Sequence, residues 1–311
     1  MSLLKFLSET LCMDRNEIIR FSLTSPHRYK IYTIPKRNLK GKRIIAHPSK
    51  ELKFIQSIIV SYLKDILPVH ESAYAYKKGV SIKDNAEVHN RTKYLLKMDF
   101  KNFFPSIIPE IFFSISSRLS IEFDDIDKLL LSNFLFCKFT KDDSLKLSIG
   151  APSSPFISNF LMYMFDKEIE EICKDKNINY TRYADDLTFS TNKKNILFGI
   201  TDIVENALKY NFKDKINLNK EKTIFSSRAH NRHITGITLT NDNKLSLGRE
   251  RKRVLSSMVH KFTINKLDPD DTLKLQGYLS FAIYIEPSFY QRMCHKYGED
   301  LLIKLKNFRI V

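Results

Sequence analysis

The chain has 311 residues, 43% of them hydrophobic, so it is long enough to bury a substantial core in two or three packed lobes. Lysine and arginine number 51 against 35 aspartates and glutamates, and the resulting formal net charge of +16 favours a polyanionic partner, most often nucleic acid. The four cysteines are dispersed, which argues against a zinc site, and the charged N-terminus argues against a signal peptide. No apolar run is long enough to cross a membrane, which argues against a membrane partner. We therefore expect a cytoplasmic protein.

The predicted helices and strands are mixed without regular alternation. In chain order we expect helices over 2–24, strands at 29–34 and 43–47 around a turn at 35–42, a helix over 51–67, mixed structure over 70–92, a strand at 93–99, a helix from 111 to 132 and beyond, a loop or hairpin at 138–146, a long helix over 153–174, a strand–turn–strand at 180–190, a helix over 201–213, short strands over 224–239 with a tight turn near Gly236, and helices over 248–311. This order favours an α+β fold over a doubly wound sheet. Neither common glycine-rich phosphate loop is present, so metal ions and basic side chains must handle any phosphate.

The predicted hairpin near the N-terminus is strongly basic. From Arg28 to Lys64 ten lysines and arginines accompany a single acid, Glu51, and aromatic residues are interleaved with them. Basic side chains can meet phosphates, and aromatic faces can stack on bases, although some of these rings will belong to the core. The segment therefore favours a nucleic-acid surface.

Two adjacent carboxylates, Asp185 and Asp186, stand inside a stretch rich in β-branched and aromatic residues. Acidic residues are poor strand formers and like charges repel, so the pairing is unfavourable by itself. At the tip of a tight turn both carboxylates could face one divalent cation, which would relieve their repulsion. The alternative is an ordinary hairpin turn that contains aspartate.

A third acid, Asp99, ends the apolar strand Tyr94-Leu-Leu-Lys-Met98. A carboxylate at that point is held rigidly at a surface or cleft, although it could also serve only as a strand-end cap. Three carboxylates can hold two divalent ions, which lower the pKa of an attacking hydroxyl and neutralise a leaving pyrophosphate. The three acids together predict two-metal phosphoryl transfer.

These motifs resemble those of reverse transcriptases in their order and spacing. Met98-Asp-Phe-Lys-Asn-Phe-Phe-Pro-Ser106 resembles polymerase motif A, Gly150-Ala-Pro-Ser-Ser-Pro155 resembles motif B, and Tyr183-Ala-Asp-Asp186 resembles motif C. The chain is more specifically similar to bacterial retron reverse transcriptases, through Asn85-Ala-Glu-Val-His89 (their N-A-x-x-H element), Ile234-Thr-Gly236 (their V-T-G element) and the stretch from Tyr29 to Lys36 (their fingers). The resemblance covers residues 25–290, and the combination is specific although each motif alone is weak.

The resemblance implies a right-hand polymerase fold with fingers, palm and thumb. The expected divisions are residues 1–92 for N-terminal helices and fingers, with the basic hairpin at 28–50, residues 93–107 for the palm with motif A, residues 108–147 for a fingers insertion, residues 148–240 for the palm with motifs B to E, and residues 241–311 for a helical, RNA-binding thumb.

The resemblance also implies roles for single residues. Asp99, Asp185 and Asp186 would be catalytic and bind two Mg²⁺ ions, with the backbone carbonyl of Phe100 as an extra ligand. Deoxynucleoside triphosphates would be the substrates, and the residues expected to contact them are Lys36, Arg43, Phe104, Gly150, Ala151 and Lys222. Phe104 would act as a steric gate against a ribose 2′-OH, and Lys222 would donate a proton to pyrophosphate. Each role has an alternative. Phe104 could be a core ring, as we expect Phe103 to be, and Lys222 could be a solvated lysine. Lys36 and Arg43 could make nonspecific contacts with the template.

A second group of residues is expected to bind RNA. Asn85 and His89 are four residues apart, so they share one helical face, and by resemblance their element helps to recognise the cognate RNA. A lone histidine, however, is usually structural. The other expected RNA-binding residues are Thr235, Gly236, Arg249, Arg251, Lys252 and Arg253. RNA is read largely through its shape, phosphates and 2′-hydroxyls, which such residues can contact.

The chain departs from many relatives just before motif B. Ser148 and Ile149 stand where a Pro-Gln pair is common, so a polar nucleotide or template contact is missing or replaced. The effect of Ile149 on nucleotide recognition stays open. Ile234 in place of valine is a conservative change.

The activity implied is reverse transcription of part of one folded noncoding RNA, the msr-msd RNA, primed from the 2′-OH of an internal guanosine. The product would be a branched RNA–DNA hybrid, msDNA, trimmed by a host RNase H, and a co-encoded effector protein would act with it in anti-phage defence. Two alternatives stay open: an intron-encoded or diversity-generating reverse transcriptase, and a catalytically inactive RNA-binding scaffold with a polymerase fold. The presence of all three acids argues against the scaffold.

Overall fold

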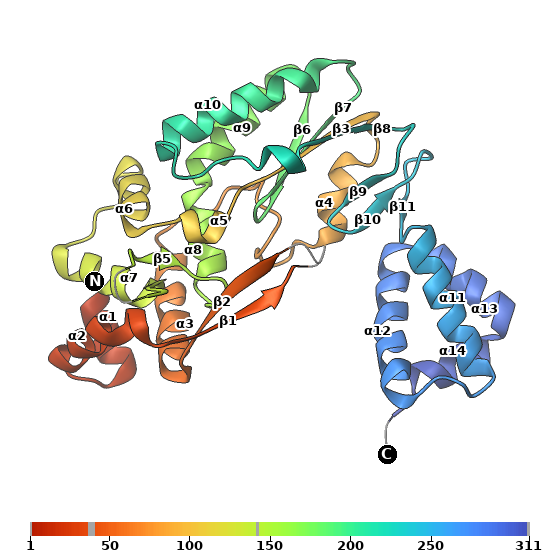
Figure 1. The fold of residues 1–311 in the computed structure, drawn as a ribbon, viewed down its shortest axis with the longest axis horizontal. Helices are drawn as coiled ribbons and strands as arrows, with labels where there is room; N and C mark the ends of the chain where they lie inside the picture. The colour runs from red at the N-terminus through yellow and green to blue at the C-terminus, as the bar shows by residue number, and fades with distance from the viewer. Residues whose placement is uncertain (1, 37–40, 141–142, 310–311) are drawn as a thin grey trace. The chain divides into compact units, whose positions relative to one another are not determined.

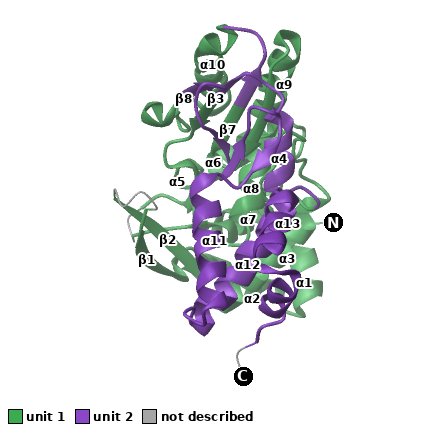
Figure 2. Cartoon of the chain, turned by 90° about the vertical axis from the view of Figure 1, so that its right-hand side faces the viewer, with its two compact units in different colours: residues 1–78, 97–188, 195–224 green, residues 79–96, 189–194, 225–311 purple. Residues whose placement is uncertain are grey.

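The computed structural model describes residues 2–36, 41–140 and 143–309. The chain forms two compact units, each assembled from separate segments (Figure 2): unit 1 comprises residues 1–78, 97–188 and 195–224, and unit 2 comprises residues 79–96, 189–194 and 225–311. Parts of the expected turn at 35–42 and of the expected loop at 138–146 lie outside the described residues.

Helices and strands are mixed along the chain (Figure 1), which confirms the α+β class. The elements of unit 1 are α1 (Leu3–Leu11), α2 (Arg15–Thr24), η1 (Ser25–His27), β1 (Tyr29–Pro35), β2 (Lys42–Pro48), α3 (Lys50–Lys64), α5 (Phe103–Ser106), α6 (Pro109–Arg118), α7 (Asp125–Leu135), β4 (Phe136–Cys137), β5 (Lys146–Leu147), α8 (Ser154–Leu161), α9 (Tyr163–Lys176), β6 (Asn179–Tyr183), η2 (Ile196–Gly199), α10 (Ile200–Phe212) and η3 (Lys220–Lys222). The elements of unit 2 are α4 (Ile82–His89), β9 (Arg232–Ile234), β10 (Ile237–Leu239), β11 (Leu245–Ser246), α11 (Arg249–Thr263), α12 (Pro269–Ile285), α13 (Pro287–Tyr297) and α14 (Glu299–Lys306).

Three further strands, β3 (Tyr94–Asp99), β7 (Asp186–Thr191) and β8 (Ile224–Ser227), have residues in both units. With β6 they form a four-stranded sheet in the order β6-β7-β3-β8. Because β3 and β7 are the two central strands, side chains on them are largely buried, and their ends are held firmly. Asp99 ends β3 and Asp186 begins β7, so this sheet fixes two of the predicted catalytic acids.

The basic hairpin predicted near the N-terminus is present in unit 1. Strands β1 and β2 pair antiparallel from Tyr29 with Pro48 to Pro35 with Lys42. Helices α1, α2, α3 and α7 pack together in the same unit. The N-terminus of α1 is tied to α7 because Asp127 accepts hydrogen bonds from the backbone N–H groups of Leu3 and Leu4, at 2.9 and 3.2 Å. A carboxylate suits that place because the first amides of a helix lack partners within it.

Unit 2 has its own hydrophobic core. Helix α4, the three-stranded sheet β11-β10-β9 and helices α11 to α14 contribute buried side chains to it, among them Ala86, Ile237, Leu255, Leu279 and Phe289. The tight turn predicted near Gly236 joins β9 to β10. Its two residues, Thr235 and Gly236, both have positive φ, at 46° and 83°, as a two-residue type I′ hairpin turn requires.

Two helices that the spacing predicts as continuous are each divided. The helix expected from residue 111 to 132 separates into α6 and α7. Asp124 starts α7 afresh, because its carboxylate caps the N–H of Asp127 at 2.7 Å. The helix expected over 153–174 separates into α8 and α9 at Met162, whose ψ of 0° interrupts the helical path.

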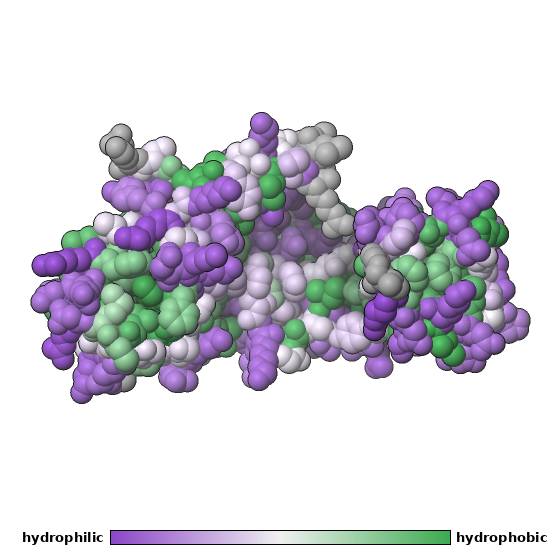
Figure 3. Space-filling view, turned by 90° about the horizontal axis from the view of Figure 1, so that it is seen from below, coloured by the Kyte–Doolittle hydropathy of each residue, from purple (hydrophilic) through white to green (hydrophobic). Residues whose placement is uncertain are grey.

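Across the residues that the structure describes, no helix combines the length and the apolar character needed to cross a membrane. The surface seen in Figure 3 carries mostly hydrophilic residues with apolar ones between them, as a chain with a net charge of +16 would be expected to present.

Candidate active site

The backbone of unit 1 joins the end of β3 to the turn that carries the acidic pair. The N–H of Phe100 donates to the carbonyl of Asp185 at 3.1 Å, and the N–H of Asn219 donates to the carbonyl of Asp99 at 2.7 Å. Asp99 and Asp185 are 86 positions apart in sequence yet share this connection through Phe100. The structure therefore brings together the acids that the sequence placed in motifs A and C.

The turn between β6 and β7 consists of Ala184 and Asp185. Ala184 adopts a left-handed conformation with φ of 57°, which disfavours a residue with a Cβ by about 1–2 kcal/mol. Strain of this kind persists where surrounding contacts hold it, and it is frequent at functional sites. Within this turn Asp185 is partly buried, and Asp186, at the start of β7, is exposed.

Two of the three carboxylates, those of Asp185 and Asp186, have raised pKa values. Burial raises the pKa of Asp185, and the negative charge of Asp99 adds to the effect. Removal from solvent and the charges of Asp185 and Asp99 raise the pKa of Asp186 to about 6. Because the side chain of Asp186 is exposed, its loss of solvent contact is partial, and repulsion from its two acidic neighbours is the cause that the geometry supports best. The cluster carries negative charge that a cation would neutralise.

One cation already contacts the cluster. Lys222, in η3, donates from Nζ to both carboxylate oxygens of Asp99, at 2.8 and 2.9 Å. The sequence pointed to Lys222 as a motif D lysine, and the structure brings its side chain to an acid of motif A. Lys222 is therefore within reach of the predicted reaction centre.

Arg43 and Lys36, both exposed in the basic hairpin, differ in what the structure shows of them. Arg43, in β2, lies close enough to Asp185 for its positive charge to offset a small part of the rise in the pKa of that carboxyl. Lys36 follows β1, where its N–H donates to the carbonyl of Gly41 at 3.0 Å. Arg43 is thus brought towards the acids, whereas the position of the Lys36 side chain supplies no comparable link.

The motif B loop packs its backbone on β2. The N–H of Ala46 donates to the carbonyl of Ile149 at 3.0 Å, so residue 149 contributes its main chain to the contact. Gly150 has φ of 125°, and a Cβ added there would lie 3.0 Å from the carbonyl oxygen of Ala46, so the close approach requires glycine. Gly150 is exposed beside the hairpin, whereas Ala151 is buried.

The two phenylalanines after Asp99 have different environments. Phe103 is buried, and its ring centroid lies 5.2 Å from that of Phe100 with the two rings tilted by 30°, as in a packed core. Phe104 is half-buried and meets Phe103 edge-on at 5.4 Å. The more accessible ring is therefore the one that the sequence assigned as the steric gate.

Sequence reasoning missed Tyr76. Its side chain is half-exposed. Partial burial raises the pKa of the Tyr76 phenol most, and the charges of Asp185 and Tyr183 raise it further, so the phenol lies near the acidic turn. Tyr76 also has a left-handed φ of 59°, a conformation that is rare for a bulky residue. Its place beside the turn depends on tertiary packing, so no local pattern could have indicated it.

In unit 2, Asn85 and His89 do lie on one face of α4, but that face is buried. Both side chains are 0% exposed. His89 Nδ1 shares a hydrogen bond of 2.6 Å with Oγ of Ser190, whereas both polar atoms of the Asn85 amide lack a partner among the described residues. In this conformation neither side chain can touch RNA directly, which corrects the direct contact expected from sequence; any effect on RNA must act through the position of α4.

The remaining expected RNA-binding residues lie on and beside α11. Arg249 and Arg253 are exposed one helical turn apart and line a shallow depression with Lys252 and Ser256. Lys252 also pairs with Glu286 at 2.6 Å.

Arg251 is engaged within unit 2 as well. It donates to the carbonyl of Gly236 at 3.3 Å and lies over the ring of Phe281. Thr235, beside Gly236, is half-buried. The freest cations of this group are therefore Arg249 and Arg253.

The chemistry of the acidic cluster fits a hard divalent cation. Carboxylate and carbonyl oxygens are the donors that Mg²⁺ prefers, and the raised pKa values of Asp185 and Asp186 report negative charge that such a cation would relieve. As they stand, no three His, Cys, Asp or Glu side chains of the described chain are grouped closely enough to hold an ion. Asp99 is hydrogen-bonded to Lys222. The donor types therefore suit a metal ion, but the carboxylates would have to move closer together to bind one.

Comparison with known proteins agrees with these motifs. Residues 34–239 match the family described as reverse transcriptase (RNA-dependent DNA polymerase). The chain is 48% identical to the retron Ec83 reverse transcriptase of Escherichia coli over 282 residues, covering 90% of each chain. It is 35% identical to the retron Ec73 reverse transcriptase of the same organism, again over 90% of each.

A solved structure supports the fold. A telomerase from Candida albicans, in complex with a fragment of telomeric RNA, superposes on 98% of this chain with a TM-score of 0.50 and 14% sequence identity. The chain spans 59% of that telomerase. At this identity the likeness concerns the fold alone, and it agrees with the right-hand polymerase architecture expected from the motifs.

Proposed function

This chain belongs to the retron reverse transcriptases, which are RNA-directed DNA polymerases, and we propose that Asp99, Asp185 and Asp186 are its catalytic residues. The observation that carries the proposal is the hydrogen-bonded junction between the end of β3 and the Ala184–Asp185 turn, together with the mutual repulsion of the three carboxylates. Carboxylates gathered from two motifs, two of them with raised pKa values, are suited to divalent metal binding.

The three carboxylates and the backbone carbonyl of Phe100 would hold two Mg²⁺ ions. When bound, these ions supply charge neutralisation at the attacking hydroxyl and at the leaving pyrophosphate. Lys222, whose Nζ lies beside Asp99, would move to the pyrophosphate and hold or donate its proton there.

Other residues would select and orient the deoxynucleoside triphosphate. Arg43, with Lys36 on the same hairpin, would contact the triphosphate, since its charge already acts on Asp185. Phe104 would exclude a ribose 2′-OH with its accessible ring. Gly150 and Ala151 would border the nucleotide, because the missing side chain at 150 lets the loop approach β2.

We assign RNA binding mainly to unit 2. Arg249 and Arg253 would contact phosphates directly, with Arg251, Lys252, Thr235 and Gly236 shaping the surface around them, and buried Asn85 and His89 would support it from within. The divisions into fingers, palm and thumb given above remain our proposal for how the chain is organised.

The template would be a cognate structured noncoding RNA, msr-msd, primed from an internal guanosine 2′-OH to give msDNA. A host RNase H would trim the hybrid, and a co-encoded effector would act with it in anti-phage defence in the cytoplasm. What supports this finer proposal is membership of the retron family and the net charge of +16.

The experiment is to express the chain with its native flanking DNA in a bacterial host, purify it, digest the bound nucleic acid with RNase and separate any single-stranded DNA by size. We expect one band of fixed length from wild type and none from Asp185→Asn. Asp202→Asn, which removes an exposed carboxylate on α10, is the matched control and should retain the band.

Three outcomes distinguish the alternatives. Debranching the band before sizing should shift it if the DNA is joined to RNA through a 2′-OH, and an unshifted band would reject the proposed priming. DNA of many lengths copied from unrelated RNA would favour an intron-type enzyme. Bound RNA with no DNA from either wild type or Asp185→Asn would leave an inactive RNA-binding scaffold.

A further inference from the structure

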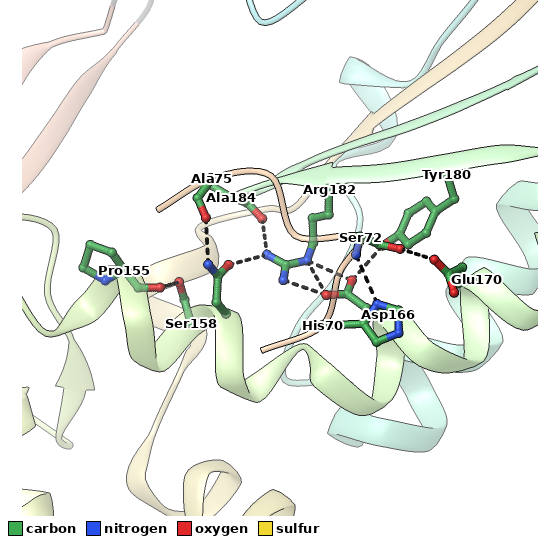
Figure 4. Close-up of polar contacts among 11 residues, drawn as sticks. His70, Ser72, Ala75, Pro155, Ser158, Asp166, Glu170, Tyr180, Arg182 and Ala184 are labelled. Atoms are coloured by element: carbon green, nitrogen blue, oxygen red, sulfur yellow. Dashed lines mark hydrogen bonds and ion pairs between the residues drawn. The ribbon is translucent and has the colours of Figure 1, made fainter. Parts of the chain in front are cut away.

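A fully buried ion pair lies behind the catalytic turn in unit 1 (Figure 4). Arg182, in β6, donates from Nε to Oδ1 of Asp166 at 2.9 Å and from Nη2 to Oδ2 at 2.7 Å. Both side chains are 0% exposed. The hydroxyl of Tyr180 also donates to Oδ1 of Asp166, at 2.8 Å. Arg182 therefore uses two of its donor groups on a single carboxylate.

Stability alone does not explain such a pair. Removing two charges from water costs several kcal/mol per ion, and well-packed apolar residues often replace buried pairs without loss. A planar guanidinium, however, presents donors in a rigid fork, so holding one edge fixes the direction of the other. The remaining donor of Arg182 shows what this rigidity serves.

The third nitrogen of the Arg182 guanidinium, Nη1, contacts the turn. Nη1 of Arg182 donates to the carbonyl of Ala184 at 3.0 Å and to Oδ1 of Asn159 at 3.1 Å. Asn159, in α8, is itself 1% exposed and donates from Nδ2 to the carbonyl of Ala75 at 2.8 Å. One arginine and one asparagine thus hold two backbone carbonyls, 109 positions apart in sequence.

Each of these carbonyls belongs to, or directly precedes, a residue in a left-handed conformation. Ala184 has φ of 57°, and Tyr76, the residue after Ala75, has φ of 59°. Neither residue is glycine, and such backbone persists only where surrounding contacts over-determine it. The Arg182–Asn159 contacts supply that constraint at both places.

The backbone reinforces the same arrangement. The N–H of Arg182 donates to the carbonyl of Ser72 at 2.7 Å, and the N–H of Tyr74 donates to the carbonyl of Arg182 at 2.8 Å, so Ala73 forms an isolated parallel β-bridge with Arg182 of β6. This pairing carries Tyr76 to the neighbourhood of Asp185, whose charge acts on the phenol.

We propose that Arg182 and Asn159, anchored by Asp166, are positioning residues that fix the Ala184–Asp185 turn and hold the Tyr76 segment beside it, so that Asp185 and Asp186 meet the metal in the reactive arrangement. The proposal rests on the metal-binding role given to these acids above. Arg182 and Asn159 act through the backbone that they hold and touch neither metal nor nucleotide.

The test uses two variants that each lose a contact with one of the two held carbonyls, that of Ala184 or that of Ala75. A third variant loses a different contact in the same network. Arg182→Lys keeps a positive charge opposite Asp166 but lacks the second arm, and Asn159→Ala removes both amide contacts. Tyr180→Phe is the matched control, because it deletes a buried hydrogen bond to Asp166 and leaves the contacts to the carbonyls of Ala184 and Ala75 in place. Readouts are kcat and KM for dNTP per titrated active site, Mn²⁺ binding by electron paramagnetic resonance, and thermal midpoint.

Arg182→Lys and Asn159→Ala are expected to lower kcat by about 10²-fold, since small displacements of reacting groups have effects of that order, while KM for dNTP changes little. Their Mn²⁺ binding should weaken about tenfold, because the carboxylates no longer converge. Tyr180→Phe should lower the thermal midpoint yet keep kcat and Mn²⁺ binding within about twofold, because one lost buried hydrogen bond affects mainly stability.

Variants whose kcat and Mn²⁺ affinity per folded molecule equal those of Tyr180→Phe would overturn the proposal and leave a purely structural network. If Arg182→Lys does not fold, Asn159→Asp carries the test, because it keeps the acceptor for Arg182 and loses the donor to Ala75; unchanged kcat and Mn²⁺ binding there would reject the proposal equally. Asp185→Asn separates the two levels: activity in Asp185→Asn would reject the catalytic assignment itself.

Discussion

Lys222 Nζ bridges both carboxylate oxygens of Asp99, at 2.8 and 2.9 Å. The Asp99 side chain is 11% exposed and that of Lys222 is 55% exposed, so an exposed cation contacts a largely buried anion. The same carboxylate is a proposed metal ligand. Under that proposal lysine and metal would compete for Asp99, and metal binding would release Lys222 towards the pyrophosphate.

Lys222→Ala separates these two roles. Nucleotide incorporation in a single turnover should slow by about 10²-fold or more, as loss of a general acid predicts. Mn²⁺ binding should become tighter, because Asp99 no longer has a competing cation. Lys220→Ala, which removes a neighbouring exposed lysine paired with Glu205, is the control and should change neither quantity. Weaker Mn²⁺ binding in Lys222→Ala would contradict the competition.

Arg249→Gln and Arg253→Gln test the surface of α11. Each arginine is exposed and, as a phosphate contact, should account for about one unit in the slope of log affinity against log salt. Binding of the cognate RNA is measured by fluorescence anisotropy at several salt concentrations. Lys306→Gln, an exposed charge change on α14, should leave the slope unaltered. Slopes equal to wild type in both arginine variants would place the RNA elsewhere.

His89 makes stability depend on acidity. Burial lowers the pKa of His89 to about 3 from an ordinary 6.5, so the folded protein keeps the imidazole neutral. Below pH 6.5 the unfolded chain binds a proton at this histidine that the folded protein does not bind. The contribution of His89 to the free energy of unfolding is therefore fully present above pH 6.5 and declines as the pH falls towards 3, by up to ~1.4 kcal/mol per pH unit.

Urea unfolding at pH 7.5 and 5.5 checks this dependence. Wild type should lose more unfolding free energy between the two pH values than His89→Gln, which cannot titrate there. An identical loss in both proteins would show that other groups cause the acid sensitivity.

Gly150→Ala should disturb the contact between the motif B loop and the hairpin. The new Cβ would lie 3.0 Å from the oxygen of Ala46 at a φ of 125°, so we expect a loss of about 1–3 kcal/mol and a higher KM for dNTP. Gly199→Ala is the control, because a Cβ there meets nothing within 4 Å, and its stability should hold. Thermal unfolding and steady-state kinetics measure both effects, and equal behaviour of the two variants would contradict the close approach.

Local sequence was sufficient to predict the features that depend on residues adjacent in the chain. The acidic pair at 185–186, the strand that ends in Asp99, the basic hairpin and the turn at Gly236 all follow from short patterns, and the structure contains each of them. Helix continuity was harder to predict, because apolar spacing persists through both breaks. Before α7 an N-cap at Asp124 starts a new helix, and at Met162 a single dihedral angle interrupts the helix.

The sequence by itself determined the family and the α+β class and singled out three acids as catalytic candidates, because these depend on residue type, order and spacing. Tertiary structure decided which side chains face solvent and which distant groups meet. It buried Asn85 and His89, and it brought Lys222 to an acid 123 positions away. It also directed Arg182 onto the carbonyl of Ala184. Such contacts depend on how whole strands and helices pack, and the pattern around any single residue does not contain that information.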